Sequence, residues 1–327
     1  MRRSSLLLAM LLVAAACSPN DIGARTSTTA APNVTTTTES PTATTTTTAN
    51  SGFPVTVEAD NGSVTIEQLP EAIVSLSSTA TEMLFAIGAG DQLVAVDDQS
   101  NFPVEAPVTE LSGFTPNIEA ILAHQPDLVV IGYEPGDLVA SLEAAGVPVV
   151  FHNAALTLED TYRQIQSLGV ATGHESESLG LNESIESELA AIADGTSDVP
   201  DGTTYYHELD NTFYTATSST FFGQIYGMFG LENIADPADG DGSAFGYPQL
   251  SSEYIVSADP DLIFLADVLY GESAETVAAR PGWDVLTAVR EGNVVELDSD
   301  IASRWGPRIV DFAQGVADAV EAFVSRG

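Results

Sequence analysis

The sequence is poor in several residue types that particular protein classes require. Its 327 residues include one cysteine, four histidines and no lysine. A single cysteine excludes a disulfide within the chain. The nine basic side chains are all arginine, and they stand against 47 acidic residues, which gives a formal charge of −38. Because phosphate binding needs a basic face, we expect no nucleic-acid partner.

Sequence motifs of common enzymes are also missing. No Gly-x-Ser-x-Gly nucleophile elbow and no Walker loop occur. The histidines are scattered rather than grouped at ligand spacing, so we expect no resident metal and no cofactor. One enzymatic alternative stays open, an exported metal-assisted hydrolase that would use His207, Glu208 and Asp210. His207 could equally be a buried core histidine.

The N-terminus has the layout of an export signal. Basic residues follow Met1, an apolar stretch runs from Leu6 to Val13, and small residues then lead to Cys17. We predict a signal peptide at 1–16 and lipidation of Cys17, as in bacterial lipoproteins. The protein is then extracytoplasmic and is anchored to the cell membrane only through lipid.

A low-complexity segment follows the cysteine. Residues 17–53 are mostly Thr, Ser, Ala, Pro and Asn, with almost no large apolar side chain. Such a segment cannot bury enough surface to offset the entropy of ordering, so we predict a flexible stalk. A coil of this length reaches roughly 30–35 Å.

One pattern occurs twice in the rest of the chain. Glu119 and Glu253 each open a short amphipathic helix that ends in Pro-Asp, and a buried apolar strand follows at 128–131 and again at 262–264. Strands and helices alternate elsewhere too, which is typical of parallel sheets covered on both faces. The repeat predicts two similar α/β lobes facing each other across a cleft.

The remaining boundaries follow from the same patterns. We predict an N-terminal α/β lobe at 54–170, a connecting helix at 171–198 and a C-terminal α/β lobe at 199–327. The helical stretch from Thr157 to Ala193 is expected to break near Gly169–Gly173. A last amphipathic helix should begin near Pro307.

Aromatic residues gather in the loops that follow the predicted strands. Because such loops face the crevice in open α/β sheets, we expect them to line the cleft. The candidates are Phe114, Tyr133, Phe245, Tyr247 and Trp305, with His207 as a polar neighbour. Aromatic walls suit a large, flat ligand rather than a bare ion.

These residues resemble those of the ABC-transporter substrate-binding proteins that carry vitamin B12 and ferric siderophores. The resemblance rests on the segments at 73–84, 117–129, 247–253 and 300–308. It implies two Rossmann-like lobes joined by one long rigid helix, the class III or cluster A architecture. It also implies that Glu119 and Glu253 dock on arginines of the permease, and that Tyr247 and Asp300 touch the ligand. Arg304 is the one basic residue that we place near the cleft.

The function expected from this resemblance is that of a receptor, not an enzyme. It would bind a metal chelate, with cobalamin or a related corrinoid first and a ferric siderophore or haem as alternatives. Its partners would be an ABC permease with its ATPase, and we expect a monomer. A surface adhesin on a glycosylated stalk is the remaining alternative, and it predicts no enclosed aromatic cleft.

Overall fold

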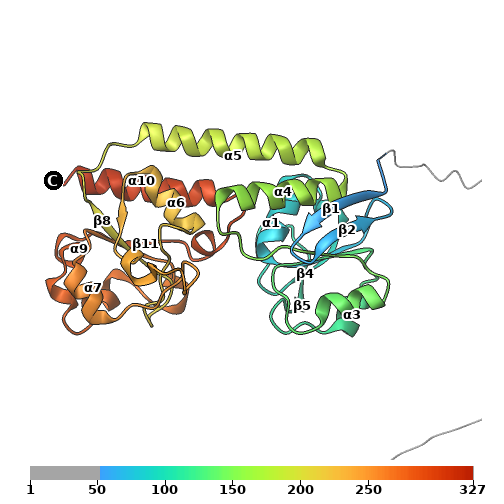
Figure 1. The fold of residues 1–327 in the computed structure, drawn as a ribbon, viewed down its shortest axis with the longest axis horizontal. Coiled ribbons are helices and arrows are strands. Elements are labelled where there is room, and N and C mark those ends of the chain that lie inside the picture. The colour runs from blue at the N-terminus through green and yellow to red at the C-terminus, as the bar shows by residue number, and fades with distance from the viewer. Residues whose placement is uncertain (1–51, 327) are drawn as a thin grey trace, which may run out of the picture. The chain divides into compact units, whose positions relative to one another are not determined.

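A computed structural model describes residues 52–326, which form two α/β lobes connected by a long helix (Figure 1). The predicted signal peptide, Cys17 and nearly all of the predicted stalk lie outside the described residues. Within the described range, none of the helices combines the length and the apolar character needed to cross a membrane.

The N-terminal lobe contains a parallel sheet of five strands. In spatial order they are β5 (Val108–Leu111), β4 (Leu93–Asp97), β3 (Ile73–Leu76), β6 (Leu128–Ile131) and β7 (Val149–Phe151). All residues of β3 and β6 are buried. This explains why their sequences are apolar runs rather than alternating patterns, since helices cover both faces of the sheet.

The helices of this lobe separate into two layers. One layer comprises α1 (Ser78–Ala86) and α4 (Leu158–Thr172), and the other comprises α2 (Ile118–Leu122) and α3 (Leu138–Ala144). Alternate strand residues join different cores: Val130 packs in the cluster that contains α1 and α4, whereas Val129 packs in the cluster that contains α2 and α3. A hairpin of β1 (Val55–Ala59) and β2 (Gly62–Ile66) also packs on α4.

The C-terminal lobe repeats this design with four parallel strands. Their order is β11 (Val294–Glu296), β10 (Leu262–Leu265), β8 (Thr204–Glu208) and β9 (Glu232–Asn233). The flanking helices are α6 (Phe221–Met228), α7 (Ser252–Ala258), α8 (Ala274–Ala278), α9 (Thr287–Glu291) and α10 (Ile309–Val324). Short 3₁₀ turns are η1 (Gly90–Gln92), η2 (Asp236–Asp239), η3 (Val268–Tyr270), η4 (Trp283–Val285) and η5 (Ile301–Ser303).

The repeated sequence pattern adopts equivalent structures in the two lobes. Asn117 and Ser251 cap α2 and α7, accepting backbone N–H bonds from Ala120 at 3.1 Å and from Tyr254 at 3.2 Å. The Asp of the Pro-Asp pair that follows each helix also accepts hydrogen bonds from the backbone at the start of a strand. Asp127 accepts hydrogen bonds from the backbone just before β3, and Asp261 accepts one from the start of β8. Each aspartate therefore fixes the start of the first strand of its own sheet.

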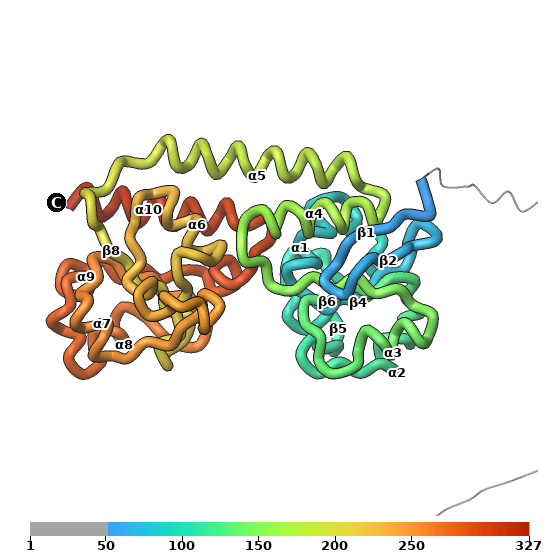
Figure 2. The backbone as a smooth tube through the Cα atoms, viewed as in Figure 1, coloured from blue at the N-terminus to red at the C-terminus, as the bar shows by residue number. Residues whose placement is uncertain are grey.

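The connection between the lobes is helical. The predicted break after α4 is present at Gly173, whose φ of +78° closes the helix, and α5 (Glu175–Gly195) then leads to the second lobe. Figure 2 shows α4, α5 and α10 lying along the same side of the two lobes, and α5 packs against both of the other two helices. The predicted architecture of two lobes with parallel sheets and one long connecting helix is confirmed.

Candidate functional site

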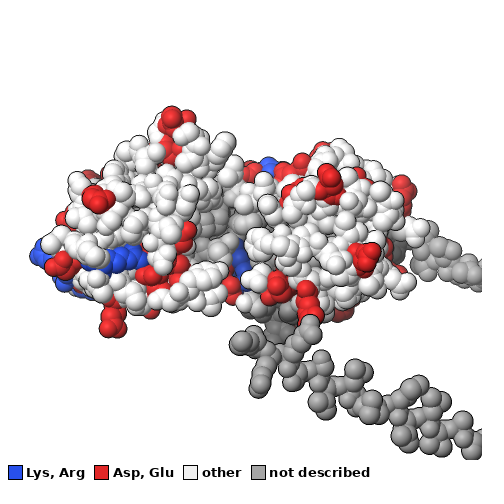
Figure 3. Space-filling model, turned by 90° about the horizontal axis from the view of Figure 1, so that it is seen from below, with Lys and Arg blue, Asp and Glu red and all other residues white. Residues whose placement is uncertain are grey.

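The carboxyl ends of both sheets meet where the lobes adjoin. Asn101, which follows β4, donates a hydrogen bond of 2.8 Å to Asp300, which follows β11. Arg304 donates one of 3.0 Å to the carbonyl oxygen of Gln99. Figure 3 shows the surface hollowed between the lobes, with arginine atoms visible inside the hollow. Loops at this edge, where ligands bind in open α/β proteins, form the candidate site.

A buried group of charges connects the two lobes at this point. Glu82, on α1, is only 3% exposed. It accepts hydrogen bonds from Arg304 Nη1 at 2.7 Å and from Arg308 Nε and Nη2 at 2.9 and 2.6 Å. Arg304 also bonds Asp300 at 2.9 Å. We refer to Glu82, Asp300, Arg304 and Arg308 as the inter-lobe latch. The hydrogen bonds to Glu82 raise the pKa of Arg308 above its ordinary value.

The latch changes the interpretation of three predicted ligand residues. Arg304 is buried and its donors are engaged by the protein, so we do not retain it as a ligand contact. Asp300 keeps part of its surface exposed and lies at the rim. Trp305 is partly buried against the core, and its indole N–H donates to Gln164 Oε1 at 2.9 Å. These three residues hold the lobes together.

Predicted aromatic residues from both lobes are exposed on these loops. Phe114 is 68% exposed and Tyr133 is 52% exposed, and their ring centroids lie 6.2 Å apart in the N-terminal lobe. Phe245, 83% exposed, lies in the C-terminal lobe. Tyr247 is half-buried beside it and packs on the core. The structure thus offers exposed rings on both lobes.

Three further apolar side chains at this edge were not among the sequence candidates. Leu269 and Tyr270 lie in η3, directly after β10, and Tyr270 is 82% exposed. Phe102 follows β4, is partly exposed, and lies 4.3 Å beneath the guanidinium of Arg308. Their position after a parallel strand was the signal that could have identified them.

His207 does not face the ligand region. It lies on β8 and is 0% exposed, its Nδ1 is 2.8 Å from the hydroxyl of Tyr226, and its ring packs on Phe222. Burial lowers the pKa of His207 to about 3, so the ring is neutral at physiological pH. Of the two predicted roles, the structure supports the buried core histidine.

The remaining members of the hydrolase hypothesis are also engaged elsewhere. Glu208 is buried and forms a bidentate ion pair with Arg280, which in turn bonds Glu272. Asp210 caps its own turn through Thr212. Across residues 52–326, no three His, Cys, Asp or Glu side chains are arranged to hold a metal ion. These residues do not assemble a catalytic site.

One carboxylate near this ion pair has no partner. Asp267 follows β10, is almost completely buried, and neither of its oxygens receives a hydrogen bond. Burial, reinforced by neighbouring Glu208, raises the pKa of Asp267 to about 6. The C-terminal lobe therefore carries surplus negative charge at its carboxyl edge.

Glu119 and Glu253 are both exposed, and each lies in the first turn of its helix, α2 or α7. Neither takes part in a salt bridge within the described residues. In Figure 2, α2 and α7 lie on the side of the lobes opposite α5. Both carboxylates are therefore accessible.

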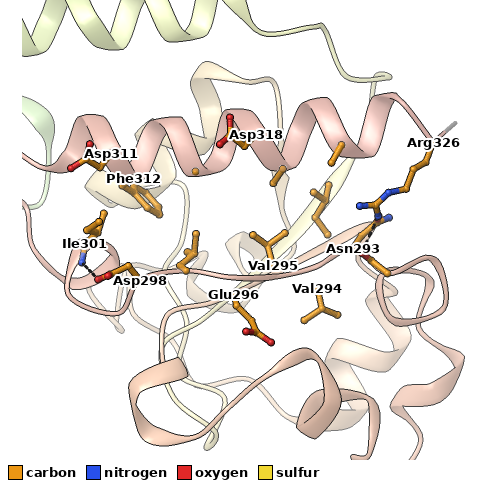
Figure 4. A pocket seen from close by; sticks show the side chains of 16 residues that line it. Asn293, Val294, Val295, Glu296, Asp298, Ile301, Asp311, Phe312, Asp318 and Arg326 are labelled. Atoms are coloured by element: carbon orange, nitrogen blue, oxygen red, sulfur yellow. Dashed lines mark hydrogen bonds between the residues drawn. The ribbon is translucent and has the colours of Figure 1, made fainter.

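A separate cavity of about 510 Å³ lies between β11 and α10 (Figure 4). Its walls include Val294 and Val295 on the edge strand and Asp311 and Asp318 on the helix. None of the exposed rings described above lines it, so we assign no ligand to it.

Comparisons with known proteins agree on one class. A family model described as periplasmic binding protein matches residues 73–301. The chain is 31% identical over 279 residues to an uncharacterized ABC transporter substrate-binding lipoprotein of Bacillus subtilis, covering 82% of this chain and 86% of that protein. It is 32% identical over 278 residues to a cobalamin-binding protein of Halobacterium salinarum, covering 82% and 74%.

Solved structures show the same fold. The periplasmic vitamin B12 binding protein BtuF of Vibrio cholerae has a TM-score of 0.60 and 25% identity, covering 78% of this chain and 99% of that one. The periplasmic heme-binding protein RhuT of Roseiflexus has a TM-score of 0.67 and 24% identity, covering 77% and 98%.

Proposed function

Because the chain belongs to the periplasmic binding protein family, whose members are solute receptors and not enzymes, we propose that it binds cobalamin or a related corrinoid and presents it to an ABC permease. The observation that carries this proposal is the set of exposed rings on loops of both lobes, led by Phe114, Phe245 and Tyr270. A corrin ring is large and flat, and aromatic side chains bury such a surface effectively.

Relatives support the choice of ligand. The cobalamin-binding protein of Halobacterium salinarum matches most of this chain at 32% identity. Ferric siderophores and haem stay alternative ligands of the same cleft, because aromatic walls also suit a porphyrin or a catecholate complex. We do not carry the hydrolase forward, since His207 is buried and Glu208 is paired with Arg280.

Uptake of labelled cyanocobalamin tests the proposal. Proteoliposomes that hold the permease and its ATPase should accumulate the vitamin only when this protein is added on the outer side and ATP is inside. A chain that binds no corrinoid and leaves uptake at the level of empty proteoliposomes would contradict the proposed ligand.

The membrane attachment is proposed to depend on Cys17 alone. Cys17→Ser removes the acceptor of the lipid and nothing that the described fold uses. In cells fed labelled palmitate, the wild-type chain should carry the label and the variant should carry none, because the thiol that accepts the lipid is gone. We propose that the protein works as a monomer, which light scattering of the variant can check.

Docking on the permease is proposed to use Glu119 and Glu253. The two carboxylates are exposed, unpaired within the described residues, and sit at equivalent points of the two lobes. Charge-assisted pairs with arginines of a partner would hold both lobes at once. A receptor that straddles a permease dimer needs one such contact from each lobe.

The test removes both carboxylates in one double variant and compares it with a control double variant that lacks two other exposed glutamates. Glu119→Ala with Glu253→Ala should abolish uptake but leave the affinity for cobalamin unchanged. Glu159→Ala with Glu275→Ala is the control, because these exposed glutamates also lie in the first turns of helices, α4 and α8, and carry the same charge. Equal uptake of cobalamin with the two double variants would contradict the docking proposal.

A further inference from the structure

The charges at the lobe junction limit which chelates the cleft can hold. On the basis of the proposed function, we infer that the cleft accepts chelates that are uncharged or cationic at neutral pH and rejects those with net negative charge. The selectivity comes from arginines that are all committed to protein carboxylates, together with a carboxylate that has no partner.

The two arginines of the latch are already occupied. Arg304 places Nη1 on Glu82 and Nη2 on Gln99 O and Asp300. Arg308 uses Nε and Nη2 on Glu82, and its guanidinium lies over the ring of Phe102. An anionic ligand would have to displace a protein carboxylate that is already buried against these groups, which exchanges one ion pair for another and adds the cost of desolvating the ligand.

The third arginine at this edge is occupied in the same way. Arg280 donates through Nη1 and Nη2 to Glu208 and through Nη2 to Glu272. Its guanidinium also lies 4.6 Å from the ring of Trp283 and 5.6 Å from that of Phe213. With both terminal nitrogens bonded to carboxylates and aromatic rings beside it, Arg280 offers little to an incoming carboxylate or catecholate.

The other arginines of the described chain lie away from the junction. Arg163 pairs with Asp160 on α4. Arg290 lies in the last turn of α9, which leads to the amino end of β11, and Arg326 donates to Gly292 O and Asn293 near that same end. Since the sequence contains no lysine, residues 52–326 supply no cation at the junction that lacks an acidic partner.

Negative charge, in contrast, is in surplus at the carboxyl edge of the C-terminal sheet. Glu208 and Glu272 both bond the single guanidinium of Arg280, whereas both oxygens of Asp267 are buried without a hydrogen bond. Asp267 is mostly ionised at neutral pH, because its pKa is about 6. In a water-poor site this charge acts on a ligand more strongly than it would in water. It repels an anion and tolerates a neutral or cationic chelate against the aromatic walls.

A calorimetric panel tests the inference on the full mature chain in detergent. Cyanocobalamin is neutral and ferrioxamine B is cationic, whereas ferric enterobactin and haemin are anionic. We expect saturable binding of a member of the first pair and at least tenfold weaker binding of both members of the second. An anionic probe that binds as tightly as the best of the first pair would overturn the charge selectivity and leave the receptor function intact. If none of the four chelates binds measurably, both the receptor function and the inference are overturned.

A gain-of-charge variant gives an independent result. Leu269→Arg adds a free guanidinium at an exposed position on the ligand edge, and Leu179→Arg adds the same charge on the exposed face of α5. Leu269→Arg should raise the affinity for ferric enterobactin about tenfold relative to Leu179→Arg, the size of one charge-assisted hydrogen bond. Equal affinities in the two variants would overturn the inference, because added charge at the cleft would then carry no selectivity.

Discussion

Glu82 is predicted to be the residue whose charge matters most for the junction of the lobes. It accepts three hydrogen bonds from Arg304 and Arg308, residues more than 200 positions further along the chain, and it is almost completely buried. Glu82→Gln keeps the shape of the side chain but removes the buried carboxylate, which leaves Arg308 without an acidic partner and Arg304 with Asp300 alone. Breaking a buried ion pair on one side costs about 3–5 kcal/mol. We therefore expect the free energy of unfolding to fall by that amount.

Urea denaturation of the two chains measures this difference. Glu143→Gln is the control, because Glu143 is exposed on α3 and forms no salt bridge among the described residues; surface changes of this kind stay within about 0.5 kcal/mol. A double-mutant cycle of Glu82→Gln with Arg304→Gln should give a coupling energy of at least about 1.5 kcal/mol. A loss for Glu82→Gln no greater than that of the control would refute the latch.

Two further outcomes follow from the same structure. The pKa of His207 is about 3 in the folded chain and about 6.5 when unfolded, so below pH 6.5 the unfolded state takes up a proton that the folded state refuses, and stability falls as the pH drops toward 3. Between pH 7 and pH 4.5 the free energy of unfolding should fall by about 2–3 kcal/mol less in His207→Phe than in the wild-type chain. Urea denaturation at both pH values measures the two decreases. Equal decreases in the two chains would contradict the account. Phe245→Ala, at a side chain 83% exposed, should weaken cobalamin binding about tenfold and change the free energy of unfolding by less than about 0.5 kcal/mol; unchanged affinity in a calorimetric titration would remove Phe245 from the site.

Most of the fold could be predicted from local patterns. Apolar runs such as Leu128–Ile131 and Leu262–Leu265 marked the buried strands. The break at Gly173 followed from its freedom to adopt a positive φ. The β1–β2 hairpin was not predicted, although Asn61-Gly62 between two alternating runs is a typical hairpin signal.

The site was less predictable, because it depends on pairings between distant residues. Nothing near Arg304 in the sequence reveals that Glu82 is its partner, so an arginine in a cleft loop was expected to face a ligand. His207 was ambiguous for another reason. Tyr206 and His207 are both buried, since both faces of β8 are covered, and the two-residue period of a strand cannot then distinguish a core position from an exposed one.

Fluorescence titration of the full mature chain with cyanocobalamin tests the central claim most directly. Trp305 lies next to the latch at the lobe junction, and Trp283 is buried within the C-terminal lobe. In a Trp283→Phe variant, Trp305 is the sole tryptophan, so its emission reports on the junction alone. The account predicts saturable quenching with one corrinoid per chain, after correction for absorbance by the ligand. Quenching of the Trp305 emission that does not saturate, together with no heat of binding in calorimetry, would contradict a corrinoid receptor.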